Sequence, residues 1–218
     1  MSDGTRHDAL IDDLVGGLTP SGRLASPGRR ALGWTALVAA AALVLTPWID
    51  WHSLAERMGV SDLRLAAIGS AITAVTAGLA AFQTSVPGRS SRWALLPLPS
   101  AALWIGASGV GCLRSWTIPV AEPTTPNAME GCFAFILAFS LPLSIVLVAM
   151  LRRACPLRPN LTAALAGLAA AAAAATLLVL FHPHDATAED LLIHLVVVAA
   201  VVAANGLLGG RLLDGRGT

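Results

Sequence analysis

Residues 161–181 of the chain read LTAALAGLAAAAAAATLLVLF. This stretch holds no charged residue, and it is as long as the roughly 20 residues that an α-helix needs to cross the hydrocarbon core of a bilayer. Backbone N–H and C=O groups inside lipid have to be hydrogen-bonded within the protein, so a helix is the natural form of such a run. The stretch therefore predicts a membrane-spanning helix.

Five further apolar runs of similar length lie on either side of this stretch. They do not alternate between apolar and polar residues, as the strands of a membrane β-barrel would. The sequence thus predicts an all-α membrane protein, a six-transmembrane-helix bundle over residues 31–210, between a cytoplasmic segment 1–30 and a cytoplasmic tail 211–218. The six predicted spans lie near Ala31–Ile49, Leu65–Phe82, Trp93–Cys112, Cys132–Leu151, Leu161–Phe181 and Leu191–Gly209.

The composition of the chain agrees with lipid as its solvent. Hydrophobic residues make up 56% and charged residues 12%, whereas a soluble domain carries about a quarter charged residues. The net charge of +1 argues against direct binding to nucleic acid. The first apolar run begins near Ala31, after a charged stretch, and is too long for a cleavable signal peptide, so we expect the first membrane helix to be the targeting signal.

The arginines predict the orientation in the membrane, because loops on the cytoplasmic side carry an excess of positive charge. Eleven of the fourteen basic residues fall before the first span, in the loops after the second and fourth spans, or after the last span, and three fall on the other side. Most acidic residues in the loops lie on that other side. We therefore expect a multi-pass protein of the bacterial inner membrane with both termini in the cytoplasm. The outer arginines are Arg57, Arg64 and Arg114.

The segment before the first span contains a predicted short amphipathic helix at His7–Leu18. Its apolar residues recur at helical spacing, and its acidic residues lie elsewhere on its surface. Acidic charge argues against binding to an anionic membrane surface. Two alternatives remain: the helix binds a hydrophobic groove of a soluble partner, or it packs on the cytoplasmic end of the bundle. The apolar stripe is Leu10, Ile11, Leu14 and Leu18, and the acids are Asp8, Asp12 and Asp13.

Thiols and imidazoles gather at the predicted outer ends of the spans. Cys112 ends the third span, Cys132 begins the fourth, and His182 and His184 follow the fifth. The two cysteines form a disulfide, or they bind a soft metal such as zinc or copper together with a histidine, or they are inert. These three alternatives stay open, because no CxxC or HxxxH spacing is present.

Small side chains, prolines and a tryptophan within the spans give further expectations. The run from Gly167 to Ala175 lets neighbouring helices approach closely, which predicts that the fifth span is central in the bundle; the alternative is that alanine is mere filler. Pro97, Pro99 and Pro142 are expected to kink or shorten their helices. Trp104 falls in mid-membrane, where its N–H needs a partner from the protein or a water.

No catalytic signature is present, so we predict that the protein is not an enzyme. The chain has no P-loop, HExxH or GxSxG motif. No span holds an ionisable residue of the kind that ion-coupled transporters use, apart from residues near its ends. The functions that remain are regulation, transport or conduction of a small neutral solute, and a structural membrane subunit that recruits another soluble protein.

Several short stretches resemble a known family in their order and in their placement on six helices. They are Asp-Ala-Leu-Ile-Asp-Asp-Leu at 8–14, Ser-Val-Pro-Gly-Arg at 85–89, Arg-Trp-Ala-Leu-Leu-Pro-Leu-Pro at 92–99, Gly-Cys-Leu-Arg at 111–114, Leu-Arg-Arg at 151–153, Pro-Leu-Arg-Pro at 156–159 and Phe-His-Pro-His-Asp-Ala-Thr at 181–187. The chain resembles the NrsF-like family of bacterial negative regulators of sigma factors over nearly its whole length.

The resemblance implies a membrane-bound anti-sigma factor. In such proteins the cytoplasmic N-terminal segment, here residues 8–18, holds an extracytoplasmic-function sigma factor away from RNA polymerase. The family is linked to sensing of oxidative or heavy-metal stress through outer cysteines, so it implies no permanent cofactor but transient heavy-metal binding. Cys132 matches one of these cysteines. Where many members carry the second, this chain has Pro183, and Cys112 is expected to serve instead.

Overall fold

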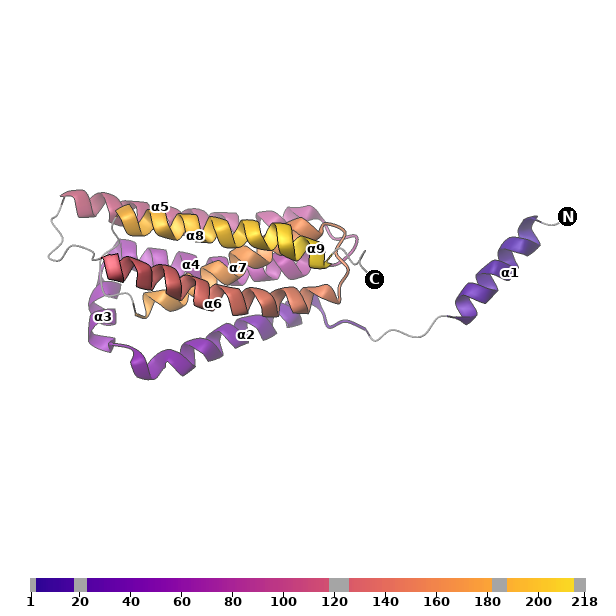
Figure 1. Ribbon diagram of the computed structural model, residues 1–218, viewed down its shortest axis with the longest axis horizontal. Coiled ribbons are helices and arrows are strands. Elements are labelled where there is room, and N and C mark those ends of the chain that lie inside the picture. Colours follow the sequence, from indigo (N-terminus) through magenta and orange to yellow (C-terminus); the bar gives the residue numbers. More distant parts are fainter. Residues whose placement is uncertain (1–2, 18–22, 118–125, 182–187, 214–218) are drawn as a thin grey trace.

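The computed structural model describes residues 3–17, 23–117, 126–181 and 188–213 of the chain. All regular elements among these residues are helices, which confirms the predicted all-α class (Figure 1). Six helical stretches are long and apolar enough to span a membrane, and each overlaps one of the six predicted spans. The helices are α1 (Asp3–Gly16), α2 (Pro27–Leu45), α3 (Trp51–Gly59), α4 (Ser61–Thr84), α5 (Leu98–Thr117), α6 (Pro126–Arg152), α7 (Pro159–Val179), α8 (Ala188–Ala204) and α9 (Gly210–Leu213).

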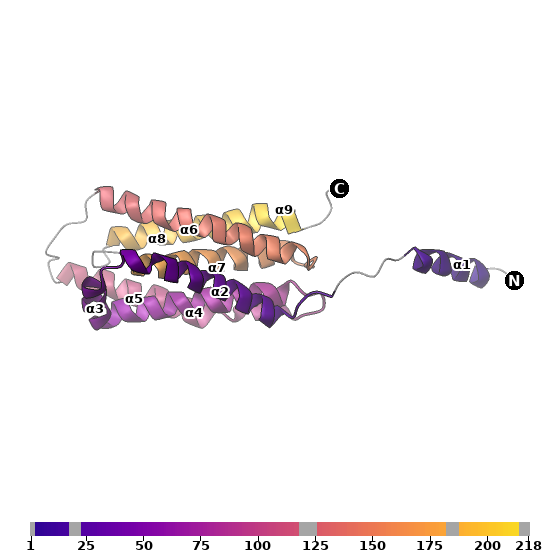
Figure 2. The same cartoon turned by 90° about the horizontal axis from the view of Figure 1, so that it is seen from below.

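The helix α7 is the centre of the bundle. In the most apolar 18-residue window of its span 78% of the residues are buried, against 11% in the windows of the first and last spans. It packs on α4, α6 and α8, and Figures 1 and 2 show it enclosed by its neighbours. At Gly167 a side chain would approach the Val201 carbonyl oxygen of α8 to 3.0 Å, so only glycine allows this helix contact. The small residues of α7 therefore serve close packing, as predicted.

Two of the three prolines shape a helix start. Residues Ser91–Leu95 form the 3₁₀ helix η2, and α5 begins only at Leu98, so Pro97 and Pro99 shorten the α-helical part of the third span. The helix α6, in contrast, runs through Pro142 to Arg152 and is not shortened. Helix α8 continues through a π-helical turn, η3 (Asn205–Gly209), into α9.

One helix was not expected. The sequence placed residues 51–59 in an outer loop, but they form α3, which lies across one end of the bundle (Figure 2). The Asp50 carboxylate begins this helix by accepting hydrogen bonds from the backbone N–H groups of His52 and Ser53, at 3.1 and 3.2 Å. The Arg57 guanidinium donates to the Val179 carbonyl at 3.0 Å and so ties α3 to the end of α7.

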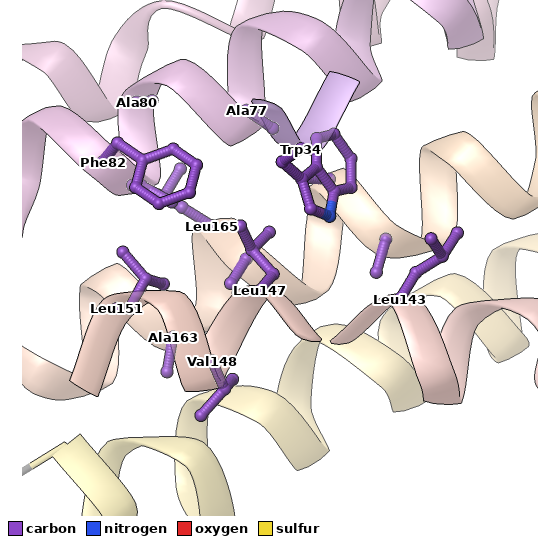
Figure 3. Close-up of a cluster of buried hydrophobic side chains, with 14 of the residues drawn as sticks. Trp34, Ala77, Ala80, Phe82, Leu143, Leu147, Val148, Leu151, Ala163 and Leu165 are labelled. Carbon is purple, nitrogen blue, oxygen red and sulfur yellow. The ribbon is translucent and has the colours of Figure 1, made fainter. Parts of the chain in front are cut away.

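The opposite end of the bundle holds the main cluster of buried side chains. The first turns of α2 and α7 meet the last turns of α4 and α6 there, and large side chains fill the space between these helices (Figure 3). Trp34, Phe82, Leu147 and Leu151 are almost wholly buried and pack among alanines of α4 and α7. We call this region the closed end of the bundle.

Candidate functional site

The N-terminal helix α1 corresponds to the helix predicted at residues 7–18. It begins earlier, at Asp3, and ends at Gly16, whereas Leu18 lies outside the described residues. The side chains of Leu10, Ile11 and Leu14 are 55%, 55% and 62% exposed. Figure 1 draws α1 apart from the bundle, and the choice between a soluble partner and the bundle end stays a prediction.

The acidic residues of α1 are exposed as well. Asp8, Asp12 and Asp13 share the short helix with the apolar side chains, and none of these carboxylates is buried. The surface available to a partner therefore combines four exposed aliphatic side chains, those named and Val15, with three acids. Binding of a partner through this surface stays a prediction, and so does the amphipathic role of the helix.

The chain that leads from α1 enters the bundle at a fixed point. Arg30, in the first turn of α2, is buried: its guanidinium lies 4.8 Å from the centre of the Phe82 ring and donates a hydrogen bond to the Met150 carbonyl of α6. One turn further, the Trp34 ring lies where a side chain at Gly78 would come within 3.1 Å. Helix α2 thus begins at Pro27, and Arg30 and Trp34 hold its first turns against α4 and α6.

The sequence did not predict that Arg30 is buried and bonded to other helices of the bundle. In the sequence it is one of four arginines before the first span, and the positive-inside rule counts only its charge. Charge and local composition do not distinguish it from Arg29, which is exposed. The signal that could have separated the two is helical spacing, because Arg30 and Trp34 lie one turn apart on the same face of α2.

Of the predicted sensor residues, Cys112 lies near the end of α5, at the end of the bundle where α3 is found (Figure 1). Cys112 is buried, and α5 continues past it to Thr117. Cys132 belongs to α6, which begins at Pro126, but its side chain is outside the described part of the structure. His182 and His184 also lie outside the described residues. The structure therefore tests neither the disulfide nor the metal site.

Among the side chains that the structure describes, no three histidines, cysteines or acids come close enough to hold a metal ion. His52 pairs instead with Glu56, 3.4 Å away on α3, and both side chains are exposed. An exposed pair of this kind contributes little to stability. His194 lies in α8, on the wall of a cavity described below.

The helices and the detached N-terminal segment define a class of protein: a polytopic helical bundle of membrane-spanning length that carries a helix outside the bundle. The model of one family matches residues 14–214, most of the chain, and this family is described as NrsF, negative regulator of sigma F. The chain belongs to the NrsF family. No curated protein and no solved structure matches it.

Membership of this family confirms the resemblance stated above. It makes the chain a negative regulator of a sigma factor, and it implies a sigma factor as partner. The family is one of regulators and is not an enzyme family. The match begins at Leu14, so residues 8–13 of the predicted binding segment precede it.

Proposed function

We propose that the protein is a membrane-bound anti-sigma factor that sequesters an extracytoplasmic-function sigma factor at the cytoplasmic face of the bacterial inner membrane. The observation that carries the proposal is the family match over residues 14–214, together with a helix outside the bundle. The asymmetry of the arginines supports an orientation with both termini in the cytoplasm. In this orientation α1 is on the side where a sigma factor works.

Helix α1 is the proposed binding element. Isolated helices of this length are marginal in water, so a partner that covers the apolar stripe also stabilises the helix. Full burial of one leucine or isoleucine contributes about 1.5–3 kcal/mol. Burial of the exposed Leu10, Ile11 and Leu14 in a groove would therefore favour binding, and Leu18 extends the stripe. The acids Asp8, Asp12 and Asp13 favour a groove with a basic rim.

A pull-down from detergent-solubilised membranes tests this proposal. Three forms of the full chain are compared: the intact protein, the double variant Leu10→Asp with Leu14→Asp, and the control Ala9→Asp with Gly16→Asp. The control adds the same two charges off the stripe, and a side chain at Gly16 meets no neighbouring atom. We expect a sigma factor to co-purify with the intact protein and the control but not with the stripe variant.

Two results would count against the proposal. If the sigma factor is retained by the stripe variant, the binding site lies elsewhere than on α1. If no sigma factor appears with any form, the anti-sigma function is wrong for this chain, and flux of neutral solutes in proteoliposomes is the next measurement.

The release signal is proposed to act at the other end of the bundle. Oxidation of Cys112 and Cys132, or binding of a soft metal by these thiols with His182 or His184, would shift the bundle between two packings, one of which presents α1 in binding form. Such a signal acts only through a difference in its affinity for the two states. The metal is bound transiently, so the proposal includes no permanent cofactor.

Replacing Cys132 by serine separates sensing from capture. The Cys132→Ser variant is expected to hold the sigma factor as the intact protein does and to keep holding it after treatment of cells with an oxidant or cadmium. Transcription from a sigma-dependent reporter measures the release. Loss of capture in untreated cells would show that the thiol is structural and would refute the switch.

A further inference from the structure

A cavity of about 250 Å³ lies inside the bundle next to α3. Its walls come from α4, α5, α7 and α8, and α3 closes it at the end. Each helix contributes one stripe: α5, for example, contributes Ala101, Trp104, Ile105 and Ser108, which recur at the spacing of a single helix face. The cavity is thus a gap between regular helices rather than a defect of a loop.

The cavity reaches deep into the bundle. Ser70 on α4 and Leu178 on α7 line it, although they are only 1% and 5% exposed. Ile105 and Leu195 line it too and are about half exposed, at 54% and 53%. The cavity therefore extends from the lipid-facing surface between α5 and α8 to the central helices. A molecule dissolved in the membrane has a direct way in.

The polar groups on the wall fall into two sets, apart from His194 of α8, which already takes part in an interaction of its own. Those on α3 and α4 already have protein partners: Arg57 donates to the carbonyls of Ser53 and Val179, and Ser70 accepts from Thr176 and donates to Ala67. On α5 the Trp104 indole N–H and the Ser108 hydroxyl have no hydrogen-bond partner among the described residues. These two donors lie one helical turn apart on the same wall.

The Trp104 indole N–H and the Ser108 hydroxyl determine which kind of ligand fits the cavity. A lipid acyl chain would cover them without accepting a hydrogen bond, and a polar group left unpaired in an apolar surrounding is unfavourable. An oxygen acceptor on an otherwise apolar molecule would pair with both. The cavity exceeds the roughly 150 Å³ that is known to take benzene and falls just below the roughly 300 Å³ at which sites for drug-sized ligands begin.

We propose that this cavity is a binding site for a small apolar molecule with one carbonyl or ether oxygen, which enters from the membrane and accepts hydrogen bonds from Trp104 Nε1 and Ser108 Oγ. The aliphatic side chains of the wall supply apolar contact and exclude water. The proposal does not rest on the proposed sigma-binding function, because binding of a small molecule to the cavity is measured without a sigma factor.

Benzophenone is a suitable probe, because it is apolar, carries one carbonyl and cross-links to nearby C–H bonds under ultraviolet light. The purified full chain in detergent micelles is irradiated with increasing benzophenone, and labelled residues are mapped by peptide mass spectrometry. We expect saturable labelling at Met58 and on the cavity-lining faces of α5 and α8. Acetophenone and ethylbenzene serve as competitors that are similar in shape and differ in the oxygen, and ethylbenzene is expected to compete at least tenfold less well than acetophenone.

Two variants on neighbouring positions provide the matched control. Ala101→Phe fills the cavity and is expected to reduce the labelling of Met58 at least tenfold. Ala102→Phe places the same ring on the exposed side of α5 and is expected to leave labelling unchanged. If Ala101→Phe fails to fold, Ser108→Ala decides: it removes one donor without adding volume, and it should shrink the preference for the ketone over the hydrocarbon.

Labelling spread evenly over lipid-facing residues, or equal in the Ala101→Phe and Ala102→Phe variants, would overturn the proposal. The cavity would then be an ordinary part of the lipid-covered surface, occupied by acyl chains. Equal competition by ethylbenzene and acetophenone in the intact protein would likewise refute the role of the two donors.

Discussion

The two ends of the helical bundle are packed differently. At the closed end, Trp34 of α2 and Leu147 of α6 insert between the alanines of α4 and α7, and little space is left (Figure 3). At the end near α3, the same central helices face α5 and α8 and leave the cavity of about 250 Å³. We call the latter the open end.

Small residues alone do not account for this difference, because both ends have them. Ala77 and Ala163 are fully buried at the closed end, whereas Ala66 and Ala101 line the cavity at the open end. Small side chains let helices approach, but large side chains of a neighbour have to fill the remaining space. At the closed end α2 is the neighbour that supplies a large side chain, Trp34. The same helix follows α1 in the chain. The contrast suggests a division of labour between an anchor for the binding helix and a region that can accept a ligand.

Removing Trp34 is expected to have the largest effect on stability. This side chain is 1% exposed, and truncation of a buried tryptophan costs about 3–5 kcal/mol. The Trp34→Ala variant should lower the free energy of unfolding in mixed micelles by an amount in this range. Trp48→Ala is the control, because Trp48 follows the same helix but is 69% exposed; its effect should be several times smaller. Equal effects would mean that the closed end is not the better packed one.

Enlarging an alanine is expected to have the next largest effect, and the loss of stability should differ between the two ends. Ala77→Leu overfills a position with no exposed surface and is expected to cost about 1–3 kcal/mol. Ala66→Leu adds the same atoms to the wall of the cavity, where there is room, and should change stability by less. Thermal unfolding of the two variants side by side measures the difference. A larger loss for Ala66→Leu would show that the open end is as tightly packed as the closed end.

The smallest expected effect concerns a hydrogen bond that joins α7 to α4 close to the cavity. Thr176 donates to the Ser70 hydroxyl at 3.0 Å. Hydrogen bonds between membrane helices contribute about 0.6 kcal/mol on average, so Thr176→Val should reduce stability by roughly that amount. A double-mutant cycle with Ser70→Ala isolates the pair, and a coupling energy near zero would show that the bond contributes nothing.

Much of the fold was predictable from the sequence, because membrane spans are encoded by the local composition of the chain. The central place of α7 followed from the run between Gly167 and Ala175, since few other side chains permit such close contact. Helix α3 was not predicted, because it is short and mixed in composition. Its only clear signal is Asp50, whose carboxylate caps the helix.

The candidate site was predictable in part. The exposed stripe of Leu10 and Leu14 follows from spacing alone, and the structure leaves it uncovered. The burial of Arg30 and the cavity were not predictable, because both depend on the angles at which helices pack and not on any one helix. The grouping of Cys112 with Cys132 stays a prediction, since it needs the position of a side chain that the structure does not describe.

The most direct test of the central claim is the location of the sigma factor in living cells. Membrane and soluble fractions are compared in cells that express the intact protein, the Leu10→Asp with Leu14→Asp variant, or the Ala9→Asp with Gly16→Asp control, each at equal amounts in the membrane. We predict that the sigma factor is in the membrane fraction with the intact protein and the control, and in the soluble fraction with the stripe variant. A sigma factor that stays soluble with the intact protein would contradict sequestration at the membrane by α1.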